Sequence, residues 1–255
     1  MGERNERLYL STIADDACAL AEQYGLGLEI AEYCTADNMD GNFARTDELV
    51  RGKMRSADRF VFHAPFNELC PAAIDPLAVE LAEKRYRQAI GVARGYGIRR
   101  LVVHSGYIPL VYDPSWFLER SAVFWREFLK DFPPDMELCL ENVMEEGPEQ
   151  MTKLAKAVND PRFRLCLDVG HANAELSHTP VPVWAEQSAP WLSHVHLHNN
   201  RGGRDLHAAL GDGTAPVRET IETIERLCPA ATYTVENMHA APSVLWLAEN
   251  GFLKV

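Results

Sequence analysis

The strongest constraint on the fold of this 255-residue chain is a regular alternation between two kinds of segment. Short runs rich in Leu and β-branched residues have the composition of buried strands, and longer amphipathic stretches typical of helices separate them. The strand-like runs are 7–12, 26–34, 59–66, 99–106, 136–143, 163–170, 192–199 and 232–238. The clearest helix-like stretches are 76–96, 115–130 and 214–227.

Strand and helix alternate eight times along the chain, and this pattern implies a parallel sheet. Eight such units in about 250 residues is the usual size of a closed (β/α)8 TIM barrel. No linker-like stretch divides the chain, so we predict a single α/β domain over residues 1–255. A doubly wound open sheet is the alternative, although no Gly-x-Gly-x-x-Gly fingerprint of dinucleotide binding follows the first strand.

Composition argues against several other classes of protein. Hydrophobic residues make up 47% of the chain, yet the longest apolar runs are far shorter than the roughly 20 residues that cross a membrane. The N-terminus lacks the apolar segment of a signal peptide, and the six cysteines are scattered singly, so we expect free thiols in the cytoplasm. The net charge of -12 disfavours extended contact with nucleic acid, whose phosphates bind Lys and Arg.

Residues that can bind metal ions gather at the carboxyl ends of the predicted strands, where barrels of this kind have their active sites. Five of the nine histidines lie at strand ends or in the loops that follow, and four carboxylates join them. These residues are His63, His104, Glu141, Asp168, His171, His196, Asp205, His207 and Glu236. So many buried anions would repel one another without cations, and mixed imidazole and carboxylate ligands favour zinc, manganese or iron over calcium.

The segment HVHLHNN places three histidines at alternate positions, which share one face of a strand. His196 belongs to the ligand set above. We expect His194 to lie one layer deeper, as a core residue or as a support for its neighbour. His198 and Asn199 are predicted to line the mouth of the site and bind substrate, and Arg201 is a candidate for binding an anionic group of that substrate.

Seven strings in the chain resemble strand-end motifs of the xylose isomerase-like TIM barrel superfamily, and they are most similar to its endonuclease IV branch (AP endonuclease family 2). In chain order, the strings are HAPF, VVHSG, LCLENV, LCLDVGHAN, HVHLHNN, DLHAALGDG and TVEN. The resemblance implies up to three metal ions. One would be held by His63, His104 and Glu141, a second by Glu141, Asp168, His196 and Glu236, and a third by His171, Asp205 and His207.

The resemblance to endonuclease IV implies a metal-dependent hydrolase that cleaves a phosphoester, with Glu141 as a bridge between two ions. In that family, the loops corresponding to 34–48 and 64–75 help to grip DNA. Here they carry a single basic residue, Arg45, among several acids. We therefore expect a small phosphoester substrate and no efficient action on DNA.

The sugar isomerases and epimerases of the same superfamily are the alternative. The resemblance to them implies a single divalent ion and a sugar or sugar-phosphate substrate. Glu141 and Glu236 would then be ligands that also move protons, and His171 would lie near the sugar. A non-catalytic metal-binding barrel is a third interpretation, and the sequence carries no indication of the oligomeric state.

Overall fold

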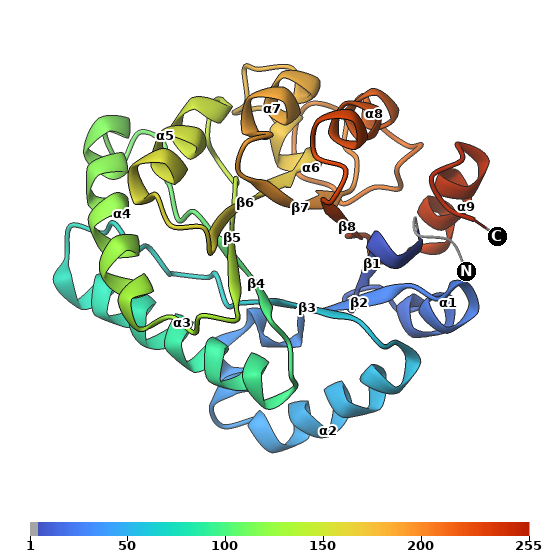
Figure 1. Ribbon diagram of the computed structural model, residues 1–255, viewed down its shortest axis with the longest axis horizontal. Coiled ribbons are helices and arrows are strands. Elements are labelled where there is room, and N and C mark those ends of the chain that lie inside the picture. Colours follow the sequence, from blue (N-terminus) through green and yellow to red (C-terminus); the bar gives the residue numbers. More distant parts are fainter. Residues whose placement is uncertain (1–4, 255) are drawn as a thin grey trace.

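The computed structural model describes residues 5–254, and within them eight parallel strands close into a barrel that helices surround (Figure 1). Each strand pairs with the next one along the chain, and the first pairs with the last. The strands are β1 (Leu8–Ser11), β2 (Gly27–Ile30), β3 (Phe60–His63), β4 (Arg100–His104), β5 (Glu137–Glu141), β6 (Phe163–Asp168), β7 (Leu192–Leu197) and β8 (Thr232–Val235). The predicted (β/α)8 TIM barrel is therefore confirmed.

The helices form a ring outside the strands (Figure 1). They are α1 (Ala17–Tyr24), α2 (Phe43–Lys53), α3 (Pro76–Gly95), α4 (Pro114–Phe128), α5 (Pro148–Val158), α6 (Val169–Ala172), α7 (Val181–Ser188), α8 (Val217–Leu227) and α9 (Ala241–Glu249). The carboxylates of Asp75 and Asp113 accept backbone N–H bonds at the starts of α3 and α4, and proline follows each of them. None of the helices over residues 5–254 is long and apolar enough to cross a membrane.

The predicted strand at 26–34 is longer than the observed one. β2 ends at Ile30, and Glu32–Cys34 form a 3-10 turn that begins the loop to α2. The predicted helices at 76–96 and 115–130 correspond closely to α3 and α4. Element boundaries are less constrained by apolar periodicity than the existence of each element, because capping and loop contacts decide where it ends.

Successive residues of each strand face opposite sides of the barrel wall, as β5 illustrates. Leu138 and Leu140 pack in the layer between the strands and the helices, whereas Cys139 lies inside the barrel. The interior cluster consists of Tyr9, Val61, Val102, Cys139 and Cys166. Glu141 is the next inward position of β5, so it lies one layer above this apolar cluster and at the carboxyl end of the strand.

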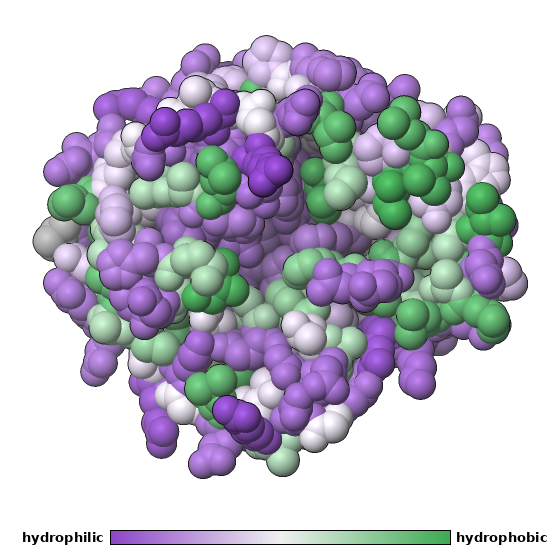
Figure 2. Space-filling model, turned by 180° about the vertical axis from the view of Figure 1, so that it is seen from behind, coloured by the Kyte–Doolittle hydropathy of each residue, from purple (hydrophilic) through white to green (hydrophobic). Residues whose placement is uncertain are grey.

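The register of the strands brings candidate ligands to the same level. His104 at the end of β4 lies beside Glu141, and Asp168 at the end of β6 lies beside His196 in β7. Seen from behind, the centre of the molecule is hollowed and lined by hydrophilic residues (Figure 2). Closure of the barrel therefore collects side chains that are far apart in the sequence around one polar space.

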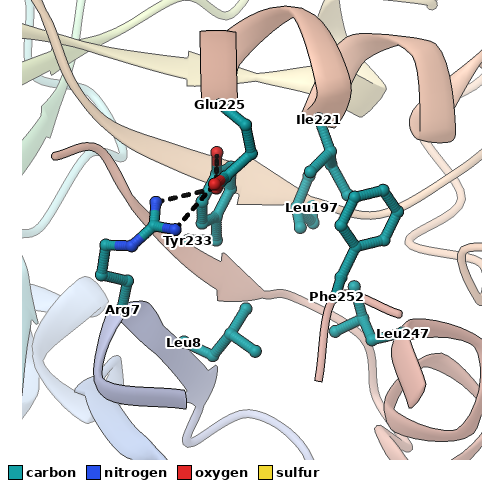
Figure 3. A pocket seen from close by; sticks show the side chains of 8 residues that line it. All are labelled: Arg7, Leu8, Leu197, Ile221, Glu225, Tyr233, Leu247 and Phe252. Carbon is teal, nitrogen blue, oxygen red and sulfur yellow. Dashed lines mark hydrogen bonds and ion pairs between the residues drawn. The ribbon is translucent and has the colours of Figure 1, made fainter. Parts of the chain in front are cut away.

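A small gap of about 10 Å³ lies between the barrel wall and the helices α8 and α9 (Figure 3). At its edge, Arg7 donates two hydrogen bonds of 2.7 Å to the carboxylate of Glu225. The hydroxyl of Tyr233 donates to the same carboxylate at 2.9 Å. The gap has about the volume that a single water molecule requires, so this cluster is a packing feature that ties β8 and the residue before β1 to α8.

Candidate metal centre

Three histidines converge on one oxygen of the Glu141 carboxylate, which is 1% exposed. The Nε2 atoms of His63 and His104 lie 3.3 and 3.5 Å from Oε2, and Nδ1 of His196 lies 3.4 Å from it. Hydrogen bonds from nitrogen to oxygen are usually about 2.7–3.2 Å long. Two ligands of one tetrahedral ion, with bonds of about 2.0–2.1 Å, lie roughly 3.3–3.4 Å apart. The observed spacing therefore fits ligand atoms around divalent ions.

Two further carboxylates approach the same nitrogen of His196. Oε2 of Glu236 lies 3.4 Å from Nδ1, and Oδ2 of Asp168 lies 3.7 Å from it. Asp168 is 0% exposed and Glu236 is 9% exposed. We refer to these six residues as the inner cluster, which comprises His63, His104, Glu141, Asp168, His196 and Glu236.

A second group surrounds Asp205, in the loop that follows β7. Its Oδ2 atom lies 3.3 Å from Nε2 of His171 and 3.0 Å from Nε2 of His207, and its Oδ1 atom lies 3.4 Å from Nδ1 of His198. We refer to His171, His198, Asp205 and His207 as the outer cluster. The structure thus brings together all nine predicted ligands, in two adjoining clusters, and adds His198 to them.

Hydrogen bonds to the protein determine which ring nitrogen of each histidine is available. A carbonyl oxygen only accepts, so Nδ1–H of His63 donates to the carbonyl of the next residue at 2.9 Å, and Nδ1–H of His207 donates to the Glu236 carbonyl at 2.8 Å. The Nε2 atoms of both rings keep their lone pairs when the rings are neutral. His196 has the opposite arrangement, because its Nε2 lies 3.0 Å from Glu29 and leaves Nδ1 free. In each ring the free nitrogen is the one that faces the carboxylates.

Glu29 in β2 is a residue of the site that the sequence analysis did not identify. Its carboxylate is 1% exposed and accepts hydrogen bonds from His194, His196 and Thr234. Burial disfavours the charged form, but the contacts with His196 and His194 outweigh it and hold the pKa of Glu29 well below its usual value. The single acid in the apolar run LGLEI was the available signal, because a carboxylate is almost never fully buried without a partner.

Asn142, directly after β5, is a second residue that the sequence analysis missed. Its amide nitrogen donates to the carbonyl of Asp168 at 3.1 Å, and its amide oxygen accepts from the Asp168 backbone at 2.9 Å. Its own carbonyl accepts from Nδ1 of His171 at 2.9 Å. Asn142 therefore positions one residue of each cluster.

The three residues predicted to bind substrate lie in different surroundings. His198 is 0% exposed, and its Nε2 lies 3.0 Å from Asp168. Asn199 is 2% exposed, and its amide bonds to the backbone of the loop between β7 and α8. Arg201 is on the open surface, where it pairs with Asp212 at 2.8 Å.

Three buried polar atoms of the clusters have no hydrogen-bond partner among residues 5–254, and they are Glu141 Oε2, His196 Nδ1 and His198 Nδ1. Buried polar atoms without a partner are rare in proteins and need an explanation. All three are atoms that can bind a metal, and all three face other such atoms. The residues present therefore fit divalent cations.

The carboxylates of the clusters shift the pKa values of the histidines around them. Burial lowers the pKa of His171, but Asp168 and Asp205 outweigh it and raise the pKa well above its usual value. In the same way, burial opposes the effect of Asp205 on His207, and the net result raises the pKa of His207 to about 9. His104 differs, because burial dominates and lowers its pKa to about 3. Metal ions and protons would thus compete for the same nitrogens.

A pocket of about 470 Å³ opens beside His104, between the loops that follow β3 and β4. Its wall is largely apolar and includes Phe66, Leu69, Cys70, Tyr107, Tyr112 and Met144. The ring of Phe66 stacks on His104 with a centroid distance of 4.2 Å. This volume is typical of sites for small molecules, which are usually about 300–1,000 Å³.

The fold and the site together define a (β/α)8 barrel with clusters suited to divalent metals at the carboxyl ends of its strands. The sequence model of the xylose isomerase-like TIM barrel family matches residues 18–243, and the chain belongs to this family. The resemblance inferred from the sequence is thereby confirmed.

Three known proteins show how the chain relates to others. The uncharacterized protein MJ1311 of Methanocaldococcus jannaschii is 25% identical over 220 residues, which cover 80% of this chain and 74% of that protein. The TTHB071 protein from Thermus thermophilus, in a structure soaked with ZnCl2, is 25% identical, with a TM-score of 0.75 over 98% of this chain and all of that one. A D-tagatose 3-epimerase-like protein is 22% identical, with a TM-score of 0.76 over 96% of both chains, and shares the fold.

We predict that metal binding releases protons and strengthens as the pH rises. His171 and His207 have raised pKa values and are protonated near neutral pH in the metal-free protein, whereas a ligand must be neutral. Zinc affinity should increase until the pH passes about 9, the pKa of His207. Titration of zinc into chelator-treated protein in weak buffer should acidify the solution, and uptake without acidification would contradict the assignment.

Replacing Glu29 by Gln should weaken metal binding without removing a ligand. The substitution removes the negative charge that raises the basicity of His196, and losses of this kind usually cost about 10–100-fold in metal affinity. Competition with a chromophoric chelator measures the effect. Glu137→Gln is the matched control, because Glu137 lies at the opposite end of the barrel wall and pairs with Arg100. Equal weakening in both variants would argue against a role for Glu29.

Proposed function

We propose that the protein is a metal-dependent isomerase or epimerase of a ketose or ketose phosphate. The observation that carries the proposal is the pair of carboxylates, Glu141 and Glu236, each 3.4 Å from Nδ1 of His196. Together with Asp168 they could hold one divalent ion, which would polarise the carbonyl of a bound sugar and acidify the neighbouring C–H bond. The shared fold of the D-tagatose 3-epimerase-like protein supports a sugar substrate.

In this proposal, Glu141 and Glu236 move the protons. They come from β5 and from the end of β8, which are not neighbours in the ring, so a sugar between them could meet one carboxylate on each side. One would accept the proton from the carbon beside the carbonyl, and the other would return a proton. Burial opposes the charge of Glu141, but His104 and His196 outweigh it and hold its pKa well below its usual value, so the carboxylate is ionised near neutral pH.

We assign His171 to a metal position rather than to the sugar. Its Nδ1 atom donates to the Asn142 carbonyl, and its Nε2 atom faces Asp205 at 3.3 Å. Nδ1 is thus held by the backbone, and Nε2 is directed at another candidate ligand. The pocket beside His104 is the better candidate for holding the part of the substrate that does not react, since it opens next to the inner cluster.

The negative charge of the chain also favours a small molecule over a nucleic acid as the substrate. The net charge is -12, and the loops that would have to grip a nucleic acid contain Arg45 as their single basic residue in the ranges 34–48 and 64–75. Three divalent ions would add about +6 and leave the protein acidic. We therefore propose that DNA is not the substrate.

Hydrolysis of a phosphoester is the second candidate, and one observation favours it. His63 and His104 approach Oε2 of Glu141 about as closely as His196 does. A single-metal isomerase has no evident use for both of these histidines. A second ion held by them would make Glu141 a bridge between two metals, an arrangement that suits attack on a phosphate. Zinc fits this set of nitrogen and oxygen ligands, as do manganese and iron.

A substrate panel with the His104→Ala variant separates the two reactions. We expect the zinc- or manganese-loaded protein to convert a ketose or ketose phosphate and to place solvent deuterium on the reacting carbon. Turnover should fall by about tenfold or less in His104→Ala, because the residue lies outside the ion position of the isomerase. In a hydrolase the same change would remove a ligand and cost about two or more orders of magnitude in rate.

Glu141→Gln is the control, because both mechanisms require this carboxylate and both should fail without it. Release of inorganic phosphate or of an alcohol from a phosphoester, with no deuterium incorporation into any ketose, would replace the isomerase proposal by the hydrolase. Efficient incision of duplex DNA at physiological salt would overturn the proposal of a small-molecule substrate.

A further inference from the structure

The connections around the mouth of the barrel contain few positive charges. Over residues 5–254, Arg201 and Arg204 are the only Lys or Arg residues between the end of a strand and the start of the next helix, and both are exposed after β7. Lys53, at the end of α2, reaches this end of the barrel, but the Thr12 carbonyl at 2.8 Å and Glu32 at 2.6 Å hold its Nζ atom. The mouth therefore offers little to bind a phosphate group, which usually requires Arg or Lys donors.

The pocket of about 470 Å³ beside His104 continues this pattern. Among the described residues that line it, Glu68 is the only acid and none is Lys or Arg. A phosphate in this space would lie near the carboxylate of Glu68 with no cation to offset either charge, which is unfavourable in a partly enclosed site. The pocket thus disfavours an anionic group and offers apolar surface instead.

A small hydrophobic cluster, separate from the main core, forms part of the pocket wall. Its buried members are Cys70, Ala72, Ala73, Tyr107 and Phe117, and the partly buried side chains packed against them include Tyr112 and Trp116. The rings of Tyr107 and Phe117 meet edge to face with their centroids 5.1 Å apart. Tyr112 and Trp116 stack with their centroids 5.7 Å apart. The apolar wall is thus packed without a ligand, which limits the cost of binding one.

His104 connects this pocket with the inner cluster. Its ring lines the pocket, and its Nε2 atom lies 3.5 Å from Oε2 of Glu141. Val143 and Met144, which follow Glu141 closely in the chain, line the pocket from the β5 side. A substrate whose carbonyl lies at the inner cluster would therefore extend its far end past His104 and into the apolar space.

We propose that the substrate is an uncharged ketose whose end remote from the carbonyl carries an apolar group, alkyl or aryl, in place of a phosphate, and that the pocket beside His104 receives this group. The inference rests on the proposed function for the carbonyl end of the substrate, and on the pocket alone for the apolar end. Burial of the apolar group should tighten binding by about fourfold per methylene until the pocket is full. Met144 has a flexible side chain that adapts to the shape of the group.

The test uses a series of 1-hydroxy-2-alkanones, which carry the hydroxyketone end of a ketose and an unbranched alkyl tail but no stereocentre. Calorimetry measures their dissociation constants with the zinc-loaded protein. We expect these constants to fall by about fourfold per methylene over the first several members of the series and then to level off. Dissociation constants that do not depend on tail length would overturn the proposal.

Two variants of pocket residues locate the tail. Ala78→Leu fills part of the pocket from α3, so the dissociation constants should level off at a shorter tail than in the wild type. Ile108→Lys adds a cation at the pocket wall, so the gain from long alkyl tails should be lost, and a hydroxyketone whose tail ends in phosphate should bind about tenfold more tightly than it binds the wild type.

Leu110→Lys is the matched control, because it adds the same charge to the same loop at a fully exposed position outside the pocket wall. It should leave the affinities for both kinds of tail unchanged. If neither Ala78→Leu nor Ile108→Lys alters the dependence on tail length, the tail binds elsewhere and the proposal is wrong.

Incorporation of solvent deuterium beside the carbonyl of the same compounds tests the proposed reaction separately. Tail-dependent binding without deuterium exchange would support the apolar pocket and reject the isomerase chemistry. Exchange catalysed by the protein without any dependence on tail length would do the reverse.

Discussion

A buried carboxylate, Glu141, lies where the rings of His63, His104 and His196 meet, and its charge must be compensated inside the barrel because water cannot reach it. Divalent ions bound by the clusters would provide this compensation, in competition with protons for the same ring nitrogens. The alternation of inward and outward residues in β5 places this carboxylate directly above an apolar interior layer that includes Cys139. The inner cluster is therefore closed from below and open at the mouth.

The residues around Glu141 are held in place by groups that lie outside the inner and outer clusters. Glu29 orients His196 from across the barrel, and Asn142 links the backbone of Asp168 to the ring of His171. These groups determine which nitrogen of a ring faces the carboxylates, and they do so before any ion binds. Preorganisation of this kind limits the cost of assembling a metal site, because the ligand rings have little freedom left to lose.

Much of the site could be predicted because, in a barrel of parallel strands, the place of a residue along its strand determines at which end of the barrel it lies. The carboxyl ends of parallel strands meet at one end of the barrel, so residues as distant as His63 and Glu236 had to converge once eight strands were recognised. Glu29 could not be placed in this way, because the predicted strand 26–34 put it in the middle of a strand, whereas β2 ends at Ile30 and brings Glu29 close to the carboxyl end. Its contact with His196 crosses the interior and joins residues 167 positions apart.

The sequence by itself determined the barrel, the family and the residues that gather at the candidate metal centre, since apolar periodicity and strand-end chemistry are local properties of the chain. Only the tertiary structure decided the surroundings of His198. The sequence places it in line with two other histidines, and this pattern is equally compatible with the open mouth and with a buried site. The difference depends on Asp168, Gly170 and the loop that carries Asp205, because these distant segments close over the ring and leave Nδ1 facing a carboxylate.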